Sequence, residues 1–136
     1  MTTDYAKPLP EMTADNSPFW EGCKRHQLLL QKCSGCGHVR YASLTCPRCW
    51  SMDHQWVPSS GRGRVYTWIV VHQRYSKAFE EDLPYNVAIV ELDEGPRLLT
   101  SLVQIENEAI RPDLQVEVAW DDVTDEITLP KFRPVS

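Results

Sequence analysis

The stretches CSGC at residues 33–36 and CPRC at residues 46–49 decide how this 136-residue chain folds. Each is a C-x-x-C pair, and nine residues separate the two pairs. A two-residue gap lets a tight turn direct both sulfur atoms toward one point, and Gly35 and Gly37 are small residues of the kind that such turns favour. The spacing therefore predicts a closed tetrahedral site for structural zinc, with the ligands Cys33, Cys36, Cys46 and Cys49.

Three other interpretations of the four cysteines were weighed. Two disulfides suit a secreted protein, but the first 25 residues lack the basic start and apolar stretch of a signal peptide. A thioredoxin-like dithiol opens a helix, whereas both pairs here fall in turns marked by Gly or Pro. Iron in the same cage would make the chain a rubredoxin-like electron carrier, and metal analysis separates it from zinc.

Short strand-like segments bracket the two turns, as a zinc ribbon requires. They are Leu28–Lys32, His38–Tyr41 and Gln55–Val57. The segment of about thirty residues is too small to fold without its metal. The sequence thus predicts a zinc ribbon over residues 28–58, preceded by an N-terminal tail and short helix over residues 1–27.

Residues 16–18, Asn-Ser-Pro, predict the start of that helix, because a capping residue is followed by Pro in the first turn. Phe19 and Trp20 come next, and adjacent residues cannot share one narrow helical stripe. We expect one of them to anchor the helix and the other to be offered to a partner, unless both are buried. The fifth cysteine, Cys23, is expected to be a small, unreactive residue at the end of the helix.

Longer β-branched and aromatic runs follow the turn-rich residues 58–61. Tyr66 and Trp68 are two residues apart, so a regular strand would place them on one face, and Trp68 is expected in the core. Five strands with turn signals between them and no long helix predict a small barrel over residues 59–136, and a mainly β chain overall. The expected strands are Val65–Val71, Tyr85–Leu92, Arg97–Val103, Gln115–Trp120 and Glu126–Phe132, with a hairpin turn at Asp93–Pro96.

Charge is unevenly distributed in this acidic chain, whose net charge is −5. Residues 22–79 carry nine Lys or Arg and one acidic residue, whereas the remainder carries five Lys or Arg and 18 acidic residues. The basic block suggests a local site for anionic groups, or simply a solvated face. No apolar run is long enough to cross a membrane and no signal peptide is evident, so the cytoplasm is the expected location.

Taken together, the motifs resemble a known family, the zinc-ribbon OB-fold acyl-CoA-associated proteins, also described as domain of unknown function 35. The resemblance covers about residues 18–135. One stretch differs, because residues 110–115 lack the Gly-rich turn that the family often carries before its fourth barrel strand. The matching segments are residues 19–22, the paired C-x-x-C turns, and residues 60–68, 84–95 and 129–134.

The resemblance implies an N-terminal helical segment, a rubredoxin-like zinc ribbon and a C-terminal five-stranded OB-fold barrel. It further implies an accessory subunit of a thiolase-superfamily enzyme, either a lipid-transfer-protein-like aldolase (a lyase) or a thiolase (an acyltransferase). A MaoC-type hydratase is the less favoured partner, and a two-plus-two heterotetramer is the expected assembly. Such complexes act on acyl-CoA substrates, including steroid side-chain, lipid and aromatic intermediates.

No catalytic activity is expected from the chain alone, because no nucleophile, base or paired acids stand at a readable spacing. The partner would supply the catalytic residues, and this chain would help to form the acyl-CoA site. Phosphate groups of acyl-CoA would be met by basic residues of the acid-poor segment and of the C-terminus. These candidates are Arg62, Arg64, Arg74, Lys77, Lys131 and Arg133.

A nucleic-acid-binding module is the alternative function, since OB barrels often bind oligonucleotides through aromatic and basic side chains. The acidic second half of the chain, including residues 80–82, argues against it because it would repel a polyanion. A steep loss of binding between low and physiological salt would identify phosphate-tracking binding of that kind.

Overall fold

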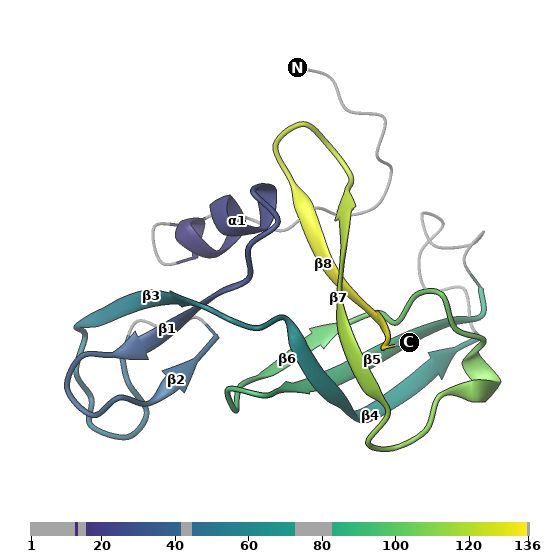
Figure 1. The fold of residues 1–136 in the computed structure, drawn as a ribbon, viewed down its shortest axis with the longest axis horizontal. Coiled ribbons are helices and arrows are strands. Elements are labelled where there is room, and N and C mark those ends of the chain that lie inside the picture. The colour runs from purple at the N-terminus through teal and green to yellow at the C-terminus, as the bar shows by residue number, and fades with distance from the viewer. Residues whose placement is uncertain (1–12, 14–15, 42–44, 73–82, 136) are drawn as a thin grey trace.

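The structure, a computed structural model, describes residue 13 and residues 16–41, 45–72 and 83–135. It begins with helix α1 (Ser17–Lys24), which is followed by two antiparallel sheets (Figure 1). The three-stranded sheet has the order β2-β1-β3 and comprises β1 (Leu29–Cys33), β2 (Val39–Arg40) and β3 (His54–Pro58). The five-stranded sheet has the order β6-β5-β4-β7-β8 and comprises β4 (Arg62–Val71), β5 (Tyr85–Leu92), β6 (Arg97–Thr100), β7 (Gln115–Asp122) and β8 (Thr128–Pro134).

This architecture confirms the predicted fold class. The chain is mainly β, with a short N-terminal helix, a four-cysteine ribbon and a five-stranded OB-fold sheet that curls into a half-barrel. A short 3-10 helix, η2 (Asn107–Ala109), lies between β6 and β7, and the hairpin turn expected at residues 93–96 is present. Among the described residues, no helix has the length and apolar character needed to cross a membrane.

One hydrophobic core joins the helix, the ribbon and the half-barrel. Phe19 of α1 is 2% exposed, and its ring meets that of Tyr41 edge-on, with 4.6 Å between the ring centroids. The same core contains residues from the first ribbon strand and from all five barrel strands. Its members include Phe19, Cys23, Leu30, Val65, Val90, Leu98, Val116 and Phe132.

The C-terminal end of α1 is tied to the barrel by His26. Its Nε2 atom lies 2.9 Å from a carboxylate oxygen of Asp122, and its ring stacks on that of Trp120. Thr128 donates a hydrogen bond to the same carboxylate, and this bond, followed by the His26 contact, holds the pKa of Asp122 below its usual value. The pair fixes the angle between the helix and the β7–β8 hairpin, which lie side by side in Figure 1.

The expectation that Tyr66 and Trp68 share one face was wrong. The register of β4 against β5 shifts between Val65 and Thr67, so the strand has a bulge at Tyr66. Trp68 lies opposite the buried Ala88 and packs against the core, whereas Tyr66 is 46% exposed. A bulge inserts one residue and reverses the alternation beyond it, which a pattern of period two does not anticipate.

The turn without glycine is built on an aspartate. Asp113 takes φ 62°, a left-handed conformation that Asp tolerates better than most residues, and its N–H donates to the Val65 carbonyl. The strand expected over residues 97–103 ends at Thr100, and Leu102 then forms an isolated parallel bridge with Phe132 of β8. The chain between β6 and η2 therefore lies against β8 and helps to close the half-barrel.

Asn86 secures this closure from inside the barrel. It is 7% exposed, accepts a hydrogen bond from the Leu102 N–H at 2.6 Å and donates one to the Leu102 carbonyl at 2.9 Å. The side chain thus satisfies both backbone groups of a buried residue that stands outside any regular strand.

Replacing Asn86 with Leu should therefore lower the free energy of unfolding by about 2–4 kcal/mol, because both backbone groups of Leu102 lose their partner. The half-buried Asn107 donates to the Pro84 carbonyl and accepts a hydrogen bond from Asn86 Nδ2 at 3.2 Å. Asn107→Ala leaves both hydrogen bonds between Asn86 and Leu102 in place and should cost less than about 1 kcal/mol. Urea unfolding of both variants measures the difference. Wild-type stability in Asn86→Leu would contradict this role.

Candidate functional site

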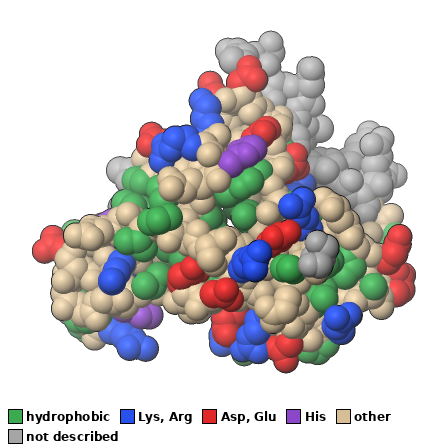
Figure 2. Space-filling model, in the orientation of Figure 1, with side chains coloured by type: hydrophobic (Ala, Val, Ile, Leu, Met, Phe, Trp, Pro, Cys, Tyr) green, Lys and Arg blue, Asp and Glu red, His purple; other side chains and the backbone are tan. Residues whose placement is uncertain are grey.

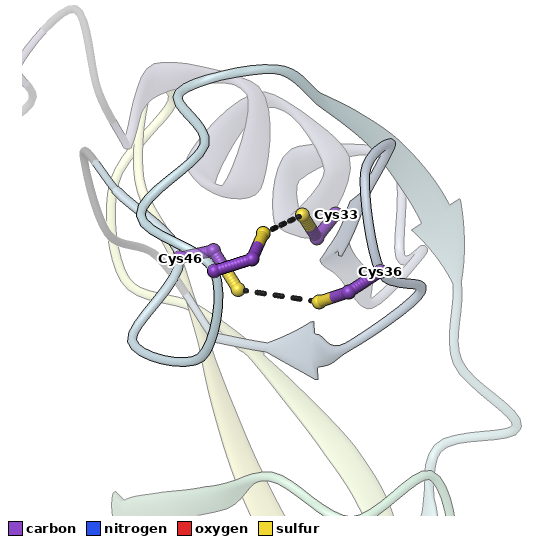
Figure 3. A group of neighbouring side chains, drawn as sticks. Cys33, Cys36 and Cys46 are labelled. Atoms are coloured by element: carbon purple, nitrogen blue, oxygen red, sulfur yellow. Dashed lines mark hydrogen bonds between the residues drawn. The ribbon is translucent and has the colours of Figure 1, made fainter.

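The four predicted ligands come together at one end of the ribbon. Their sulfur atoms all lie within 4.8 Å of one another, with Cys33 and Cys46 buried and Cys36 and Cys49 exposed. The Cys33 and Cys49 sulfurs are 3.5 Å apart and the Cys36 and Cys46 sulfurs 3.6 Å apart. Figure 3 marks the contact between Cys36 and Cys46 with a dashed line. These separations are far longer than a disulfide bond of about 2.0 Å, and all four cysteines are free.

The two C-x-x-C turns have matching backbone geometry. In each, an N–H two residues after the first cysteine donates to its sulfur: Gly35 N to Cys33 Sγ at 3.3 Å, and Arg48 N to Cys46 Sγ at 3.4 Å. The residue after the second cysteine takes a positive φ, 79° at Gly37 and 67° at Trp50. Amide groups aimed at sulfur favour thiolate, so the turns are shaped to present charged ligands.

The same contacts perturb the thiol pKa values. The backbone N–H of Cys36 is the main cause that lowers the pKa of Cys33, to about 6. Burial opposes the change at Cys46, but the N–H groups of Cys49 and Arg48 still lower its pKa. The Ser51 N–H is the largest single influence on Cys49 and lowers its pKa, but the contact with Cys33, burial and the contacts with Cys36 and Cys46 together raise that pKa to about 12. A bound metal ion would displace the protons that the sulfur atoms share.

This donor set fits zinc. Four sulfurs around a zinc ion at about 2.3 Å would lie about 3.8 Å apart at the corners of a tetrahedron, close to the separations found here. Cys33, Cys36, Cys46 and Cys49 would hold the ion, and four protein ligands leave no position for water or substrate. The cluster is consistent with structural zinc, and its role is to hold the two turns together.

Four of the six predicted acyl-CoA-binding cations lie on one face of the half-barrel. Arg62 and Arg133 both stand opposite Glu117 in the β4–β7–β8 register, Arg64 stands opposite Gln115, and Lys131 stands opposite Ala119. Directly opposite residues share a face, so the structure brings these four cations to the outer face of the half-barrel. Arg74 and Lys77 lie outside the described residues.

Acidic residues of the same chain accompany most of these cations. Arg64 contacts Glu91 at 2.8 Å and also contacts Asp113, Lys131 contacts Asp121 at 2.6 Å, and Arg133 contacts Glu117 at 3.2 Å. Figure 2 shows basic and acidic side chains interspersed on the side of the molecule that it presents. Arg64, Lys131 and Arg133 are therefore each paired with acidic residues of the same chain.

The two residues predicted for a partner interface occupy different environments. Phe19 is 2% exposed and belongs to the chain's own core. Trp20 is half-buried and lines a cavity of about 540 Å³ between α1, β6 and β8. Its Nε1 atom is buried and has no hydrogen-bond partner among the described residues.

Sequence reasoning missed an apolar outer face on β4, β5 and β6. Every other residue of β5 from Tyr85 to Ile89 points away from the core, and these outward residues are apolar. Ile89 lies opposite Leu99 of β6, and Val87 lies opposite Ile69 of β4. Leu99 is 74% exposed and Ile69 61%, so this face, defined by Ile69, Val87, Ile89 and Leu99, is open to solvent. The signal in the sequence is a strand that is apolar at both alternating sets of positions.

The described residues show no catalytic constellation. The one described His–carboxylate contact, His26 with Asp122, has no nucleophile hydrogen-bonded to its ring. His54 contacts the Met52 carbonyl and the Gln31 amide, which are structural partners. Ser59 and Thr128 donate hydrogen bonds to the carboxylates of Glu94 and Asp122, and over the residues that the structure describes neither hydroxyl is paired with a histidine base. The four-cysteine cluster leaves a bound metal no open position.

A four-cysteine ribbon joined to an OB-fold half-barrel defines a class of zinc-ribbon OB-fold proteins. The family models for the ChsH2 rubredoxin-like zinc ribbon domain and the ChsH2 C-terminal OB-fold domain match residues 20–55 and 56–121, respectively. The chain belongs to this family, ChsH2/DUF35, as its similarity to individual members also shows.

One curated relative is a probable enoyl-CoA hydratase alpha subunit of Thermomonospora curvata, 40% identical over 129 residues. The match covers 94% of this chain but only 40% of that relative. A DUF35 domain-containing scaffold protein of Methanocaldococcus jannaschii is 34% identical over 125 residues, which cover 85% of this chain and 88% of the relative. A benzoylsuccinyl-CoA thiolase subunit, BbsA, of Geobacter metallireducens is 33% identical over 89 residues, covering 64% and 57%.

A solved structure described as an Ltp2-ChsH2(DUF35) aldolase contains a chain similar to this one along nearly its whole length. The TM-score is 0.84 at 40% identity, and the match covers 93% of this chain and 98% of that chain.

Zinc should be bound at one equivalent per chain, and Cys33→Ser should lose it together with the cooperative thermal unfolding of the ribbon. Cys23→Ala is the matched control, because Cys23 is buried on α1 outside the four-sulfur cluster and should leave the metal content unchanged. Metal analysis by mass spectrometry with thermal melts measures both. One equivalent of iron, or zinc retained by Cys33→Ser, would contradict the assignment.

Proposed function

We propose that this chain is a non-catalytic accessory subunit that binds and stabilises a thiolase-superfamily enzyme acting on acyl-CoA. The observation that carries the proposal is the likeness to the ChsH2(DUF35) chain of the Ltp2 aldolase, which covers 98% of that chain at 40% identity. The relatives described as a scaffold protein and as a thiolase subunit support the same role.

The chemistry of the described residues supports an accessory role. The four-sulfur cluster has no open coordination position, and His26 is bound to Asp122 in a contact that ties two elements together. The carbon–carbon bond cleavage or formation that aldolases and thiolases perform would therefore use catalytic residues of the partner. This chain would contribute shape and help to form the acyl-CoA site.

The apolar outer face is the surface that we assign to the partner. Exposed apolar side chains at Ile69 and Leu99, with Val87 and Ile89 between them, form a patch on a rigid sheet. Contiguous exposed apolar surface is uncommon on monomeric proteins and marks protein interfaces. A thiolase-superfamily subunit is the occupant because the similar chain of known structure belongs to a complex with Ltp2.

Two finer features complete the proposal, and both rest on the sequence and on general principles. We assign the acyl-CoA of the complex to a site near the cations of the outer face, Arg62, Arg64, Lys131 and Arg133. Arg74 and Lys77, which lie outside the described residues, belong to the same proposal. Two-fold assemblies predominate among oligomers, so two copies of this chain would join a partner dimer. The ion pairs within the chain make a nucleic-acid-binding function the weaker alternative.

Co-expression with the thiolase-superfamily protein encoded nearest to this chain tests the proposal. We expect a stable complex with equal amounts of the two proteins, in which acyl-CoA turnover requires both. Leu99→Glu combined with Ile69→Glu should weaken the complex at least about tenfold, because binding would bury two unpaired carboxylates. Size-exclusion chromatography and turnover assays measure both effects.

Met52→Glu is the matched control, since Met52 is an apolar residue that is 59% exposed on the ribbon, outside the outer face of β4, β5 and β6. It should leave the complex intact. Equal weakening by Met52→Glu would refute the assignment of the outer face. A partner that is fully active alone and does not bind this chain, or binding of nucleic acid that falls steeply with salt, would refute the proposed function.

A further inference from the structure

Arg40 is a buried charge without a counter-ion. It lies on β2, is 6% exposed, and none of its three guanidinium nitrogens has a hydrogen-bond partner among the described residues. A guanidinium is always charged in proteins and has five N–H donors that seek oxygen acceptors. A buried guanidinium without hydrogen-bond partners is costly, so its presence needs an explanation. Binding of an anionic ligand would supply both the missing acceptors and the missing negative charge.

Arg40 lines a cavity of about 420 Å³ where the ribbon meets the turn between β5 and β6, and its three guanidinium nitrogens are buried behind the cavity wall. Arg48 of the second C-x-x-C turn and Arg97 at the start of β6 also line it, and Glu94 is the one carboxylate there. The Glu94 carboxylate accepts hydrogen bonds from Ser59 Oγ at 2.7 Å and from the Ser60 N–H at 2.8 Å. The Glu94 carboxylate is thus already hydrogen-bonded to residues outside the cavity. Three arginines and one carboxylate give the described lining an excess of two positive charges.

Arg97 is held in place by its own contacts. Its Nε donates to Glu91 at 3.1 Å, and its guanidinium carbon lies 3.9 Å from the centre of the Tyr66 ring. Arg40 is fixed by the strand on which it lies, because β2 pairs with β1 through Gln31. Two of the three cations are therefore pre-positioned, which lowers the cost of ordering them on binding.

A second cavity adjoins the first. The cavity of about 540 Å³ that Trp20 lines shares Tyr41 and Arg97 with the Arg40 cavity, and its other walls include Leu98 and Leu129. Trp20 Nε1 is a second buried donor without a partner. The two cavities form one groove between ribbon and barrel, basic at one end and largely apolar at the other.

We propose that this groove binds a phosphomonoester, with the phosphoryl group on Arg40 and the organic part of the ligand beside Trp20. A phosphomonoester carries nearly two negative charges at neutral pH, which matches the excess in the lining better than a single carboxylate does. Its oxygen atoms also match the guanidinium fork, which binds phosphate in bidentate fashion. The site is distinct from the outer-face cations, because Arg62, Arg64, Lys131 and Arg133 do not line the Arg40 cavity.

Calorimetric titration of the full-length, zinc-loaded chain tests the proposal. The probes are coenzyme A, dephospho-coenzyme A, which lacks the 3′-phosphomonoester, and inorganic phosphate. The choice of coenzyme A rests on the proposed function, but binding to the chain alone needs no protein partner. We expect dephospho-coenzyme A to bind at least about tenfold more weakly than coenzyme A, and Arg40→Met to abolish the difference.

Arg111→Met is the matched control, because Arg111 is an exposed arginine that does not line the groove and is not among the cations assigned to acyl-CoA. It should bind all probes as wild type does. Without ligand, Arg40→Met should melt at or above the wild-type temperature, since it removes an uncompensated buried charge, and coenzyme A should raise only the wild-type melting temperature.

Several outcomes would overturn the proposal. Equal affinity for coenzyme A and dephospho-coenzyme A, or wild-type affinity in Arg40→Met, would exclude a phosphomonoester on Arg40. Binding of inorganic phosphate alone would keep the phosphoryl site and exclude the organic part from the adjoining cavity. If no probe binds and Arg40→Met instead abolishes the complex with a thiolase-superfamily partner, the counter-ion is a partner carboxylate, and the proposed function stands without the phosphate site.

Discussion

The ribbon depends on the attraction between four cysteine thiolates and one metal ion. Two of its strands have five residues and the third has two, so backbone pairing alone gives little stability. Without an ion, sulfurs within 4.8 Å of one another must keep protons or repel. With it, the two C-x-x-C turns become one rigid unit that orients β2, and β2 carries Arg40 to the groove beside the barrel. The metal therefore helps to position Arg40 in the groove although Arg40 is not one of its ligands.

Much of the fold could be predicted from the sequence because its signals are local. The cysteine spacing defines the cluster, Pro18 marks the start of α1, a β-branched and aromatic run marks β5, and apolar alternation marks β7. What could not be predicted depends on contacts distant in sequence or on irregular backbone. The bulge at Tyr66 reverses a strand's faces, and the His26–Asp122 contact joins residues 96 positions apart. Likewise, Arg40 could be counted as one of the basic residues, but its burial arises only when ribbon and barrel meet.

The charged surfaces of the chain differ in how far they are neutralised. On the outer face of β4, β7 and β8, Lys131 and Arg133 contact acidic residues of the same sheet. In the groove, Glu94 accepts hydrogen bonds from Ser59 and Ser60, and the Arg40 guanidinium has no hydrogen-bond partner within the described part of the chain. The apolar outer face of β4, β5 and β6 adjoins the groove, because Leu99 of that face also lines the cavity beside Trp20.

Hydrogen exchange of the native chain, followed before and after removal of the metal with a chelator, tests most directly whether the thiolate–metal cluster holds the ribbon. We expect the amides of β1 and β3 to lose their protection when the metal is removed, while those of β4, β5 and β7 keep theirs, because the barrel has its own buried strands. Ribbon amides that exchange at the same rate with and without metal would contradict the dependence of the ribbon on its metal.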